Sequence, residues 1–272
     1  ERELPIIWRI AKGSFKNKLL YLLPAGLLLS QFAPWAITPL LMLGGAYLCF
    51  EGAEKVAHAA GWGGHGHTDY PDAQNHPQDP AHLEETKAQG AIKTDFILSA
   101  EIMTIALAAI PKSNIFQEAI TLALVAIMIT VAVYGAVALI VKADDLGLAM
   151  ARDGATESLR AAGRGIVKAM PHVMSGLTII GTAAMLWVGG SIVVHGLHEL
   201  GAHAPYEIIH ALAGGFAHIS PEPIKGIVEW VFTAAGDGVV GLALGYVLIP
   251  VGERVITPLW RAAMALKPAK AP

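Results

Sequence analysis

Residues 93–110 read K-T-D-F-I-L-S-A-E-I-M-T-I-A-L-A-A-I, a polar start followed by an almost unbroken apolar run that stops at Pro111. A membrane-spanning helix needs about 20 mostly apolar residues, and this run approaches that length. It places Asp95 near one end of the helix and Glu101 close to its middle. A carboxylate at membrane depth is costly and usually faces a hydrated path, a partner charge or a bound ion. The stretch therefore predicts an all-α membrane protein with a carboxylate inside it.

The composition of the whole chain favours the same class. Of 272 residues, 54% are hydrophobic and only 15% are charged, and the mean hydropathy is +0.52. A soluble domain carries roughly a quarter charged residues, so we expect the lipid bilayer to be the main partner. The net charge of −3 is too small to predict a nucleic-acid partner. Cys49 is the single cysteine, which excludes an intramolecular disulfide.

Six segments have the character of membrane spans, and we predict them at about 19–36, 36–57, 94–110, 115–141, 174–194 and 227–250. If the N-terminus lies in the cytoplasm, every lysine and arginine except Lys112 and Lys225 falls on the cytoplasmic side. This is the bias that membrane proteins show, and it predicts that both termini are inside.

Three stretches between the spans differ in character. Residues 61–89 are rich in glycine, histidine, proline and acid, and we expect a polar loop. Residues 146–170 interleave apolar and basic side chains at helical spacing, which predicts an amphipathic helix on the inner leaflet. The apolar piece 208–217 is too short to span, so we expect a re-entrant or interfacial helix on the outer side.

Two fragments resemble each other. Residues 38–54 read T-P-L-L-M-L-G-G-A-Y-L-C-F-E-G-A-E, and residues 182–198 read T-A-A-M-L-W-V-G-G-S-I-V-V-H-G-L-H. They fall in predicted spans that run in opposite directions, so a genuine repeat would be inverted, with three spans in each half, as in many secondary transporters. The third span of each half would then carry one acid, Glu101 or Asp237. The alternative is a chance match between helices that use small residues for close packing.

Several acids are candidates for an ion path. Glu101 is the first choice, and the alternative is a structural acid packed against another helix. Asp95 could assist it or could cap the start of its helix. Asp144 and Asp145 could form a solvated pair or a cation entry site on the inner side. The full set of candidates is Glu101, Asp95, Asp237, Asp144, Asp145 and Glu51.

A second kind of chemistry is suggested by His195 and His198, which share a helix face with each other, and by Glu199 just beyond them. Imidazole and carboxylate ligands at this spacing can bind a divalent transition metal, although loop histidines are commonly just solvated. Nucleotide-binding and hydrolase motifs do not occur in the sequence, so we predict neither an enzyme nor ATP-driven transport.

Four long motifs resemble the YedI family of bacterial inner-membrane proteins. They are residues 93–102, K-T-D-F-I-L-S-A-E-I; residues 34–55, P-W-A-I-T-P-L-L-M-L-G-G-A-Y-L-C-F-E-G-A-E-K; residues 141–147, V-K-A-D-D-L-G; and residues 188–196, V-G-G-S-I-V-V-H-G. The resemblance implies a multi-pass protein of the bacterial inner membrane with an extension upstream of Glu1. It supplies no function. The matching positions include Asp95, Glu101, Asp144, Asp145, Glu51 and His195, but not Asp237.

Taken together, these features predict a secondary transporter or ion-coupled permease in which Glu101 binds a proton or cation and Asp95 and Asp237 assist. Two alternatives remain open at this point. One is a membrane scaffold whose acids only hold helices together, and the other is a metal-binding membrane protein. The faces of small residues on the predicted helices also leave a homo-oligomer open.

Overall fold

The computed structural model of the chain describes residues 3–61, 80–110 and 114–251. Every regular element among these residues is a helix. The chain divides into two compact units. Unit 1 comprises residues 1–37 and 69–180, and unit 2 comprises residues 38–68 and 181–272. Most of the predicted polar loop, residues 62–79, lies outside the described part.

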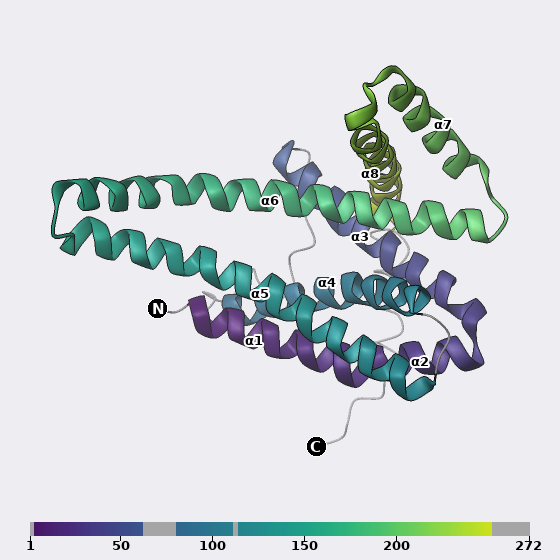
Figure 1. Cartoon of the computed structure of the whole chain (residues 1–272), viewed down its shortest axis with the longest axis horizontal. Coiled ribbons are helices and arrows are strands. Elements are labelled where there is room, and N and C mark those ends of the chain that lie inside the picture. The colour runs from purple at the N-terminus through teal and green to yellow at the C-terminus, as the bar shows by residue number, and fades with distance from the viewer. Residues whose placement is uncertain (1–2, 62–79, 111–113, 252–272) are drawn as a thin grey trace. The chain divides into compact units, whose positions relative to one another are not determined.

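Unit 1 contains the helices at the start of the chain, up to residue 37, together with α4, α5 and the start of α6. The elements are α1 (Glu3–Lys16), η1 (Asn17–Leu22), α2 (Leu23–Phe32), η2 (Pro34–Ala36), α4 (Pro80–Ala109), α5 (Ile115–Asp153) and the part of α6 (Glu157–Glu199) up to residue 180. Helix α1 packs against both α4 and α5 (Figure 1). The buried core of this unit consists of Leu27, Met103, Leu122 and Ala126.

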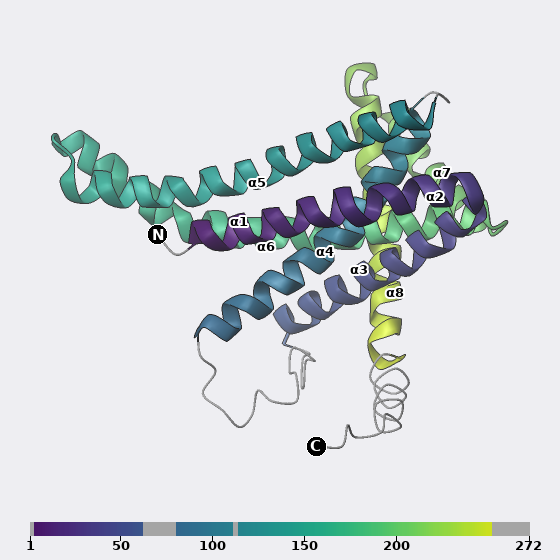
Figure 2. The ribbon, with the colours of Figure 1, turned by 90° about the horizontal axis from the view of Figure 1, so that it is seen from below.

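Unit 2 is built from α3 (Ile37–Ala59), the second part of α6, α7 (Ala204–Ile219), η3 (Glu222–Ile224) and α8 (Lys225–Val251). A turn after α6 contains Gly201 with a φ of 98°, a conformation that glycine adopts without strain. Helix α7 then folds back and packs along α8. Figures 1 and 2 show α8 crossing the second part of α6 steeply.

Within the described part of the chain, four helical segments are long and apolar enough to cross a membrane, namely Pro34–Ala59, Ile115–Asp153, Glu157–Glu199 and Glu222–Val251. They contain the predicted spans 36–57, 115–141, 174–194 and 227–250. The other two predicted spans, 19–36 and 94–110, lie in helical segments that are not among these four. The structure thus agrees with an all-helical membrane protein, while six spans and the orientation of the termini stay predictions.

Two predicted boundaries differ from the structure. Helix α4 begins at Pro80, so residues 80–89 are helical and not part of a loop. The predicted amphipathic helix 146–170 is divided between two helices, because α5 ends at Asp153 and α6 begins at Glu157. Gly154 has an extended backbone there, and the Thr156 hydroxyl accepts a hydrogen bond from the Leu159 amide at 3.3 Å, which starts the new helix.

A helix forms over the apolar piece 208–217, and its place on the outer side stays a prediction. Residues 208–217 lie within α7, which is 16 residues long and therefore too short to span a bilayer as a straight helix.

Candidate functional site

Among the described residues of unit 2, Asp237 is the most deeply buried acid. It belongs to α8, and it is only 2% exposed. Its Oδ1 atom has no hydrogen-bond partner among the described residues. The side chains that act on the carboxylate are Ser191 and His195 of α6 and His210 of α7. A buried polar atom without a partner costs free energy, so such an atom in a native structure calls for an explanation, of which a bound ion or a functional role is one.

Glycines bring the backbones of α6 and α8 together at this point. A Cβ atom at Gly190 would meet the carbonyl oxygen of Asp237, and one at Gly241 would meet the carbonyl oxygen of Leu186. Small residues allow this close approach between membrane helices. The contact fixes the position of Asp237 along α6.

The two histidines next to Asp237 are oriented in the same way. His195 Nδ1 lies 3.0 Å from the backbone carbonyl oxygen of Ser191, and His210 Nδ1 lies 3.0 Å from that of Tyr206. A carbonyl only accepts hydrogen bonds, so each neutral imidazole carries its hydrogen on Nδ1. Each Nε2 atom is therefore left with a free lone pair.

The ring of Tyr206 in α7 is surrounded by imidazoles. It stacks on His210 with ring centroids 3.9 Å apart, and it meets the edge of His195 at 5.1 Å. His198 lies 4.4 Å from the same ring. We call His195, His198, His203 and His210, together with Tyr206, the histidine cluster.

The outer end of the histidine cluster lies at the turn between α6 and α7. His198 Nδ1 and His203 Nδ1 are 3.0 Å apart, a distance at which one imidazole donates a hydrogen bond to the other. His203 is exposed, whereas His198 is partly buried. His195 is exposed as well, and His210 is partly buried.

In unit 1, Asp95 forms an ion pair with Lys18. The Lys18 ammonium donates to Ser14 Oγ at 2.6 Å and lies 3.3 Å from Asp95 Oδ2. It also lies over the ring of Tyr134, 6.0 Å from its centroid. Asp95 is far inside α4, which begins at Pro80, so the alternative of an N-terminal cap is wrong. Lys18 was not among the predicted site residues, because the sequence pattern marks it only as a cytoplasmic charge.

Glu101 lies in α4 and is partly buried. It makes no hydrogen bond or ion pair with any described residue; the neighbouring Thr104 hydroxyl donates instead to the Ala100 carbonyl at 2.8 Å. Glu101 belongs to unit 1 and Asp237 to unit 2, so a cavity shared by these two acids stays a prediction.

Of the remaining candidate acids, one forms an ion pair and two lie within a continuous helix. Glu51 Oε1 accepts from Lys55 Nζ at 2.9 Å. Asp144 and Asp145 are partly buried within α5, which continues to Asp153, so they do not follow the end of a helix.

The predicted metal ligands have separate partners in unit 2. His195 is turned toward Ser191, His198 contacts His203, and Glu199 Oε2 accepts from the Thr38 hydroxyl at 2.6 Å. In the described part of the chain, no group of three or more histidine, cysteine or acidic side chains could hold a metal ion. A metal at His195, His198 and Glu199 therefore gains no support from the structure.

The helices of the two similar fragments pack against each other. A Cβ atom at Gly45 of α3 would meet the carbonyl oxygen of Gly189 in α6, and one at Gly189 would meet that of Gly45. Matching positions on either side also meet: Gly52 faces Leu186, and Gly196 faces Met42. The contacts are reciprocal, as expected when two antiparallel helices are related by an approximate twofold axis.

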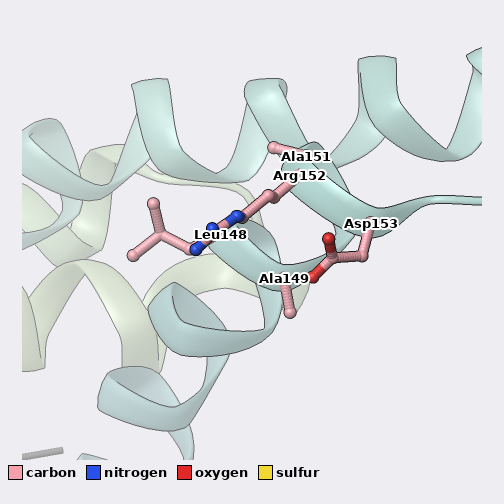
Figure 3. A pocket seen from close by; sticks show the side chains of 5 residues that line it. All are labelled: Leu148, Ala149, Ala151, Arg152 and Asp153. Carbon is pink, nitrogen blue, oxygen red and sulfur yellow. The ribbon is translucent and has the colours of Figure 1, made fainter.

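A surface hollow of about 560 Å³ lies at the end of α5 (Figure 3). Its lining comes from one short stretch of that helix and contains Leu148, Ala149, Ala151, Arg152 and Asp153. None of the candidate site residues lines it, so we assign no function to it.

Comparison with known proteins gives one match. The model of a family described as "Protein of unknown function (DUF808)" matches residues 1–251. No curated protein and no solved structure matches the chain. The narrower resemblance to the YedI family is not tested by this match.

Proposed function

We propose that this chain, which belongs to the DUF808 family of proteins of unknown function, is a secondary transporter or ion-coupled permease in which Asp237 binds the coupling ion. The observation that carries the proposal is the unpartnered Oδ1 atom of Asp237, whose side chain is 2% exposed. Asp237 lies in α8, within one of the four segments long and apolar enough to cross a membrane. Intramembrane acids of this kind mark ion and substrate pathways.

The sequence favours Glu101 as the ion-binding acid, but the structure favours Asp237 because its side chain is more deeply buried. Glu101 makes no hydrogen bond with a described residue, and Asp237 leaves its Oδ1 atom without a partner, but Glu101 is more exposed. Asp237 also has titratable neighbours from two other helices, His195 and His210. A group whose charge changes on binding a cation needs neighbours that respond to that charge, and Asp237 has them. Glu101 stays a separate candidate for ion binding in unit 1.

The packing of α3 against α6 also supports transport. Secondary transporters are commonly built from inverted repeats that meet near the middle of the membrane. The reciprocal contact between Gly45 and Gly189 joins the two similar fragments in the antiparallel sense that such a repeat requires. The contact lies one residue from Gly190, against which the Asp237 backbone packs. The proposed ion site would thus lie beside the symmetry axis.

The competing function is a membrane scaffold, and the Lys18–Asp95 ion pair favours it for unit 1. There an acid and a base satisfy each other and hold α4 against η1. Among the described residues no lysine or arginine acts on Asp237, and its Oδ1 atom has no hydrogen-bond partner. We therefore place the transport function in unit 2, and we place the protein in the bacterial inner membrane, where its partners would be lipid and a small ion or solute.

The test is an ion-flux measurement on the purified full chain in proteoliposomes that contain a pH-sensitive dye. A potassium gradient with valinomycin sets the membrane potential, and amino acids, sugars, organic acids, Na⁺ and Li⁺ are added in turn. We expect one class to produce ion movement that Asp237→Asn abolishes. Glu229→Gln, which changes an exposed acid on the same helix, is the matched control and should keep the flux.

Two results would decide against the proposal. Full flux in Asp237→Asn would remove Asp237 from the ion path. The absence of any movement in the wild-type vesicles, with correctly folded protein shown by its elution profile, would favour the scaffold.

A further inference from the structure

We infer that the corner between α6 and α7, residues 198–203, is a pH-sensitive latch. His198 and His203 close it at neutral pH, and acid opens it, so that the first half of α7 leaves α8. Three observations carry this: the contact between the two imidazoles, the rings around Tyr206, and the seat of α7 on α8. The latch concerns unit 2 alone and does not depend on the transport function proposed above.

The latch is the direct contact between His198, in the last turn of α6, and His203, which precedes the first residue of α7. Their Nδ1 atoms are 3.0 Å apart, so one carries the shared hydrogen and the other offers its lone pair. The turn between them is closed by backbone hydrogen bonds from the Gly201 amide to the His198 carbonyl and from the Ala202 amide to the Leu197 carbonyl. The imidazole pair thus ties the start of α7 to the end of α6.

This pair of imidazoles accommodates one additional proton but not two. With one, a charged imidazole donates from Nδ1 to its neutral partner. With two, both Nδ1 atoms carry a hydrogen, and two positive rings with centroids 4.5 Å apart repel each other. In the open corner water solvates both rings, so both are protonated at a pH below the ordinary histidine range. In acid the open form therefore binds one proton more than the closed form, and the closed form loses stability as the pH falls.

The rings around Tyr206 add to this effect. The centroid of the Tyr206 ring lies 4.4 Å from that of His198 and 5.1 Å from that of His195, both in α6, and His210 stacks on it at 3.9 Å. One positive imidazole over a phenol ring is stabilised by the π electrons of that ring. Several positive imidazoles around one ring repel each other, so their joint protonation weakens the contact between α6 and α7.

The charged groups near the corner do not compensate for the second proton. Helix α6 contributes Glu199, which accepts a hydrogen bond from the Thr38 hydroxyl of α3 at 2.6 Å. Helix α7 contributes the exposed Glu207, and α8 contributes the buried Asp237. In the described part of the chain, none of these carboxylates forms an ion pair with either imidazole of the latch. No lysine or arginine occurs in residues 195–222.

The first half of α7 lies on α8 beside Asp237. Ile209 is 7% exposed, and a Cβ atom at Gly236 would meet its Cγ2 atom at 2.9 Å. In the second half of α7, Phe216 stacks on Phe232 with ring centroids 4.1 Å apart, a contact without a titratable group. When the latch opens, the first half of α7 therefore leaves α8 and uncovers Gly236, while the second half stays in place.

The test is amide hydrogen exchange of the full chain in lipid nanodiscs between pH 8 and pH 5, followed by mass spectrometry. Protection factors remove the pH dependence of the intrinsic exchange rate. We expect the protection of residues 204–210 to fall about tenfold for each pH unit below about 6, because one proton separates the open from the closed form. Residues 241–248 of α8 are the internal reference, and their protection should stay constant.

Two variants test whether the imidazole pair is the cause. His203→Asn keeps a hydrogen-bonding side chain that does not titrate, and it should remove the dependence of protection on pH. A purely structural loss would lower protection equally at every pH and keep that dependence. His198→Asn should behave in the same way and is the variant to use if the first fails to fold. His218→Asn changes an exposed histidine of α7 outside the histidine cluster and should retain the wild-type behaviour.

Two results would overturn the inference. One is a protection factor of residues 204–210 that stays constant from pH 8 to pH 5 in the wild type. The other is a pH dependence that persists in His203→Asn or His198→Asn. The proposed function fails separately: if the latch responds as expected while Asp237→Asn keeps full flux, the latch is real and the transport role is wrong.

Discussion

Lys18 and Asp95 form an ion pair inside unit 1, with the lysine Nζ atom 3.3 Å from Oδ2 of the aspartate and the lysine side chain 4% exposed. Lys18 lies in η1, a π-helical stretch between α1 and α2. Such stretches are uncommon and often occur where a side chain must be placed for function. The pair neutralises Asp95 in unit 1, whereas Oδ1 of Asp237 in unit 2 has no hydrogen-bond partner among the described residues.

Lys18→Met should strongly destabilise the protein. The substitution keeps the length and apolar contacts of the side chain but leaves the Asp95 charge without its partner. Breaking a buried ion pair from one side costs about 3 kcal/mol. The measurement is the temperature at which the detergent-solubilised protein loses its monodisperse elution peak, and we expect a fall of several degrees.

The double variant Lys18→Met, Asp95→Asn tests the physical reason. With both charges removed, the penalty for an unpaired charge disappears, so most of the lost stability should return. Lys12→Met, an exposed lysine of α1, is the control and should change little. A double variant as unstable as the single one would show that Lys18 acts through packing and not through its charge.

Gly190→Ala should disrupt the crossing of α6 and α8. The added methyl group would meet the carbonyl oxygen of Asp237, which is backbone and cannot turn aside. Overpacking of this kind costs about 1–3 kcal/mol. Gly181→Ala is the matched control on the same helix, because a Cβ there meets nothing within 4 Å. Thermal unfolding of both variants gives the comparison, and equal midpoints would contradict the close contact between the two backbones.

Gly201→Ala should weaken the turn that carries the outer end of the histidine cluster. Its φ of 98° is unfavourable for any residue with a Cβ atom, and the expected cost is about 1 kcal/mol. Gly214→Ala, at an open position within α7, should be neutral or slightly stabilising. Amide hydrogen exchange at the start of α7 is the most direct measurement. Unchanged exchange in Gly201→Ala would mean that the turn tolerates the strain.

The membrane-spanning helices were the most predictable part of the fold. Spans such as 115–141 are recognised from composition alone, because a long apolar run has few alternatives to a helix in lipid. The helix predicted over 146–170 was less predictable. Its apolar and basic residues keep helical spacing across Gly154, so the pattern does not reveal that the chain breaks there.

The site was predictable only in part. Asp237 stands out in the sequence as an acid within an apolar run, and the structure indeed buries it. Its neighbour His210 could not be assigned, since the fold-back of α7 along α8 brings it near. The Lys18–Asp95 pair was missed for the same reason, because its partners are 77 residues apart and belong to different helices.

Asp237→Asn and Asp95→Asn should change stability in opposite directions, which separates an acid kept for function from one kept for structure. Asp95→Asn removes the counter-charge of the buried Lys18 and should lower the midpoint of thermal unfolding. Asp237→Asn removes a buried charge that lacks a hydrogen-bond partner at Oδ1, so it should raise stability by about 1–2 kcal/mol. Active sites commonly sacrifice stability in this way. The measurement is the unfolding midpoint of each variant in the same detergent at pH 8. A fall in both variants would mean that Asp237 is a structural acid with a partner of its own, and the transport role would lose its main support.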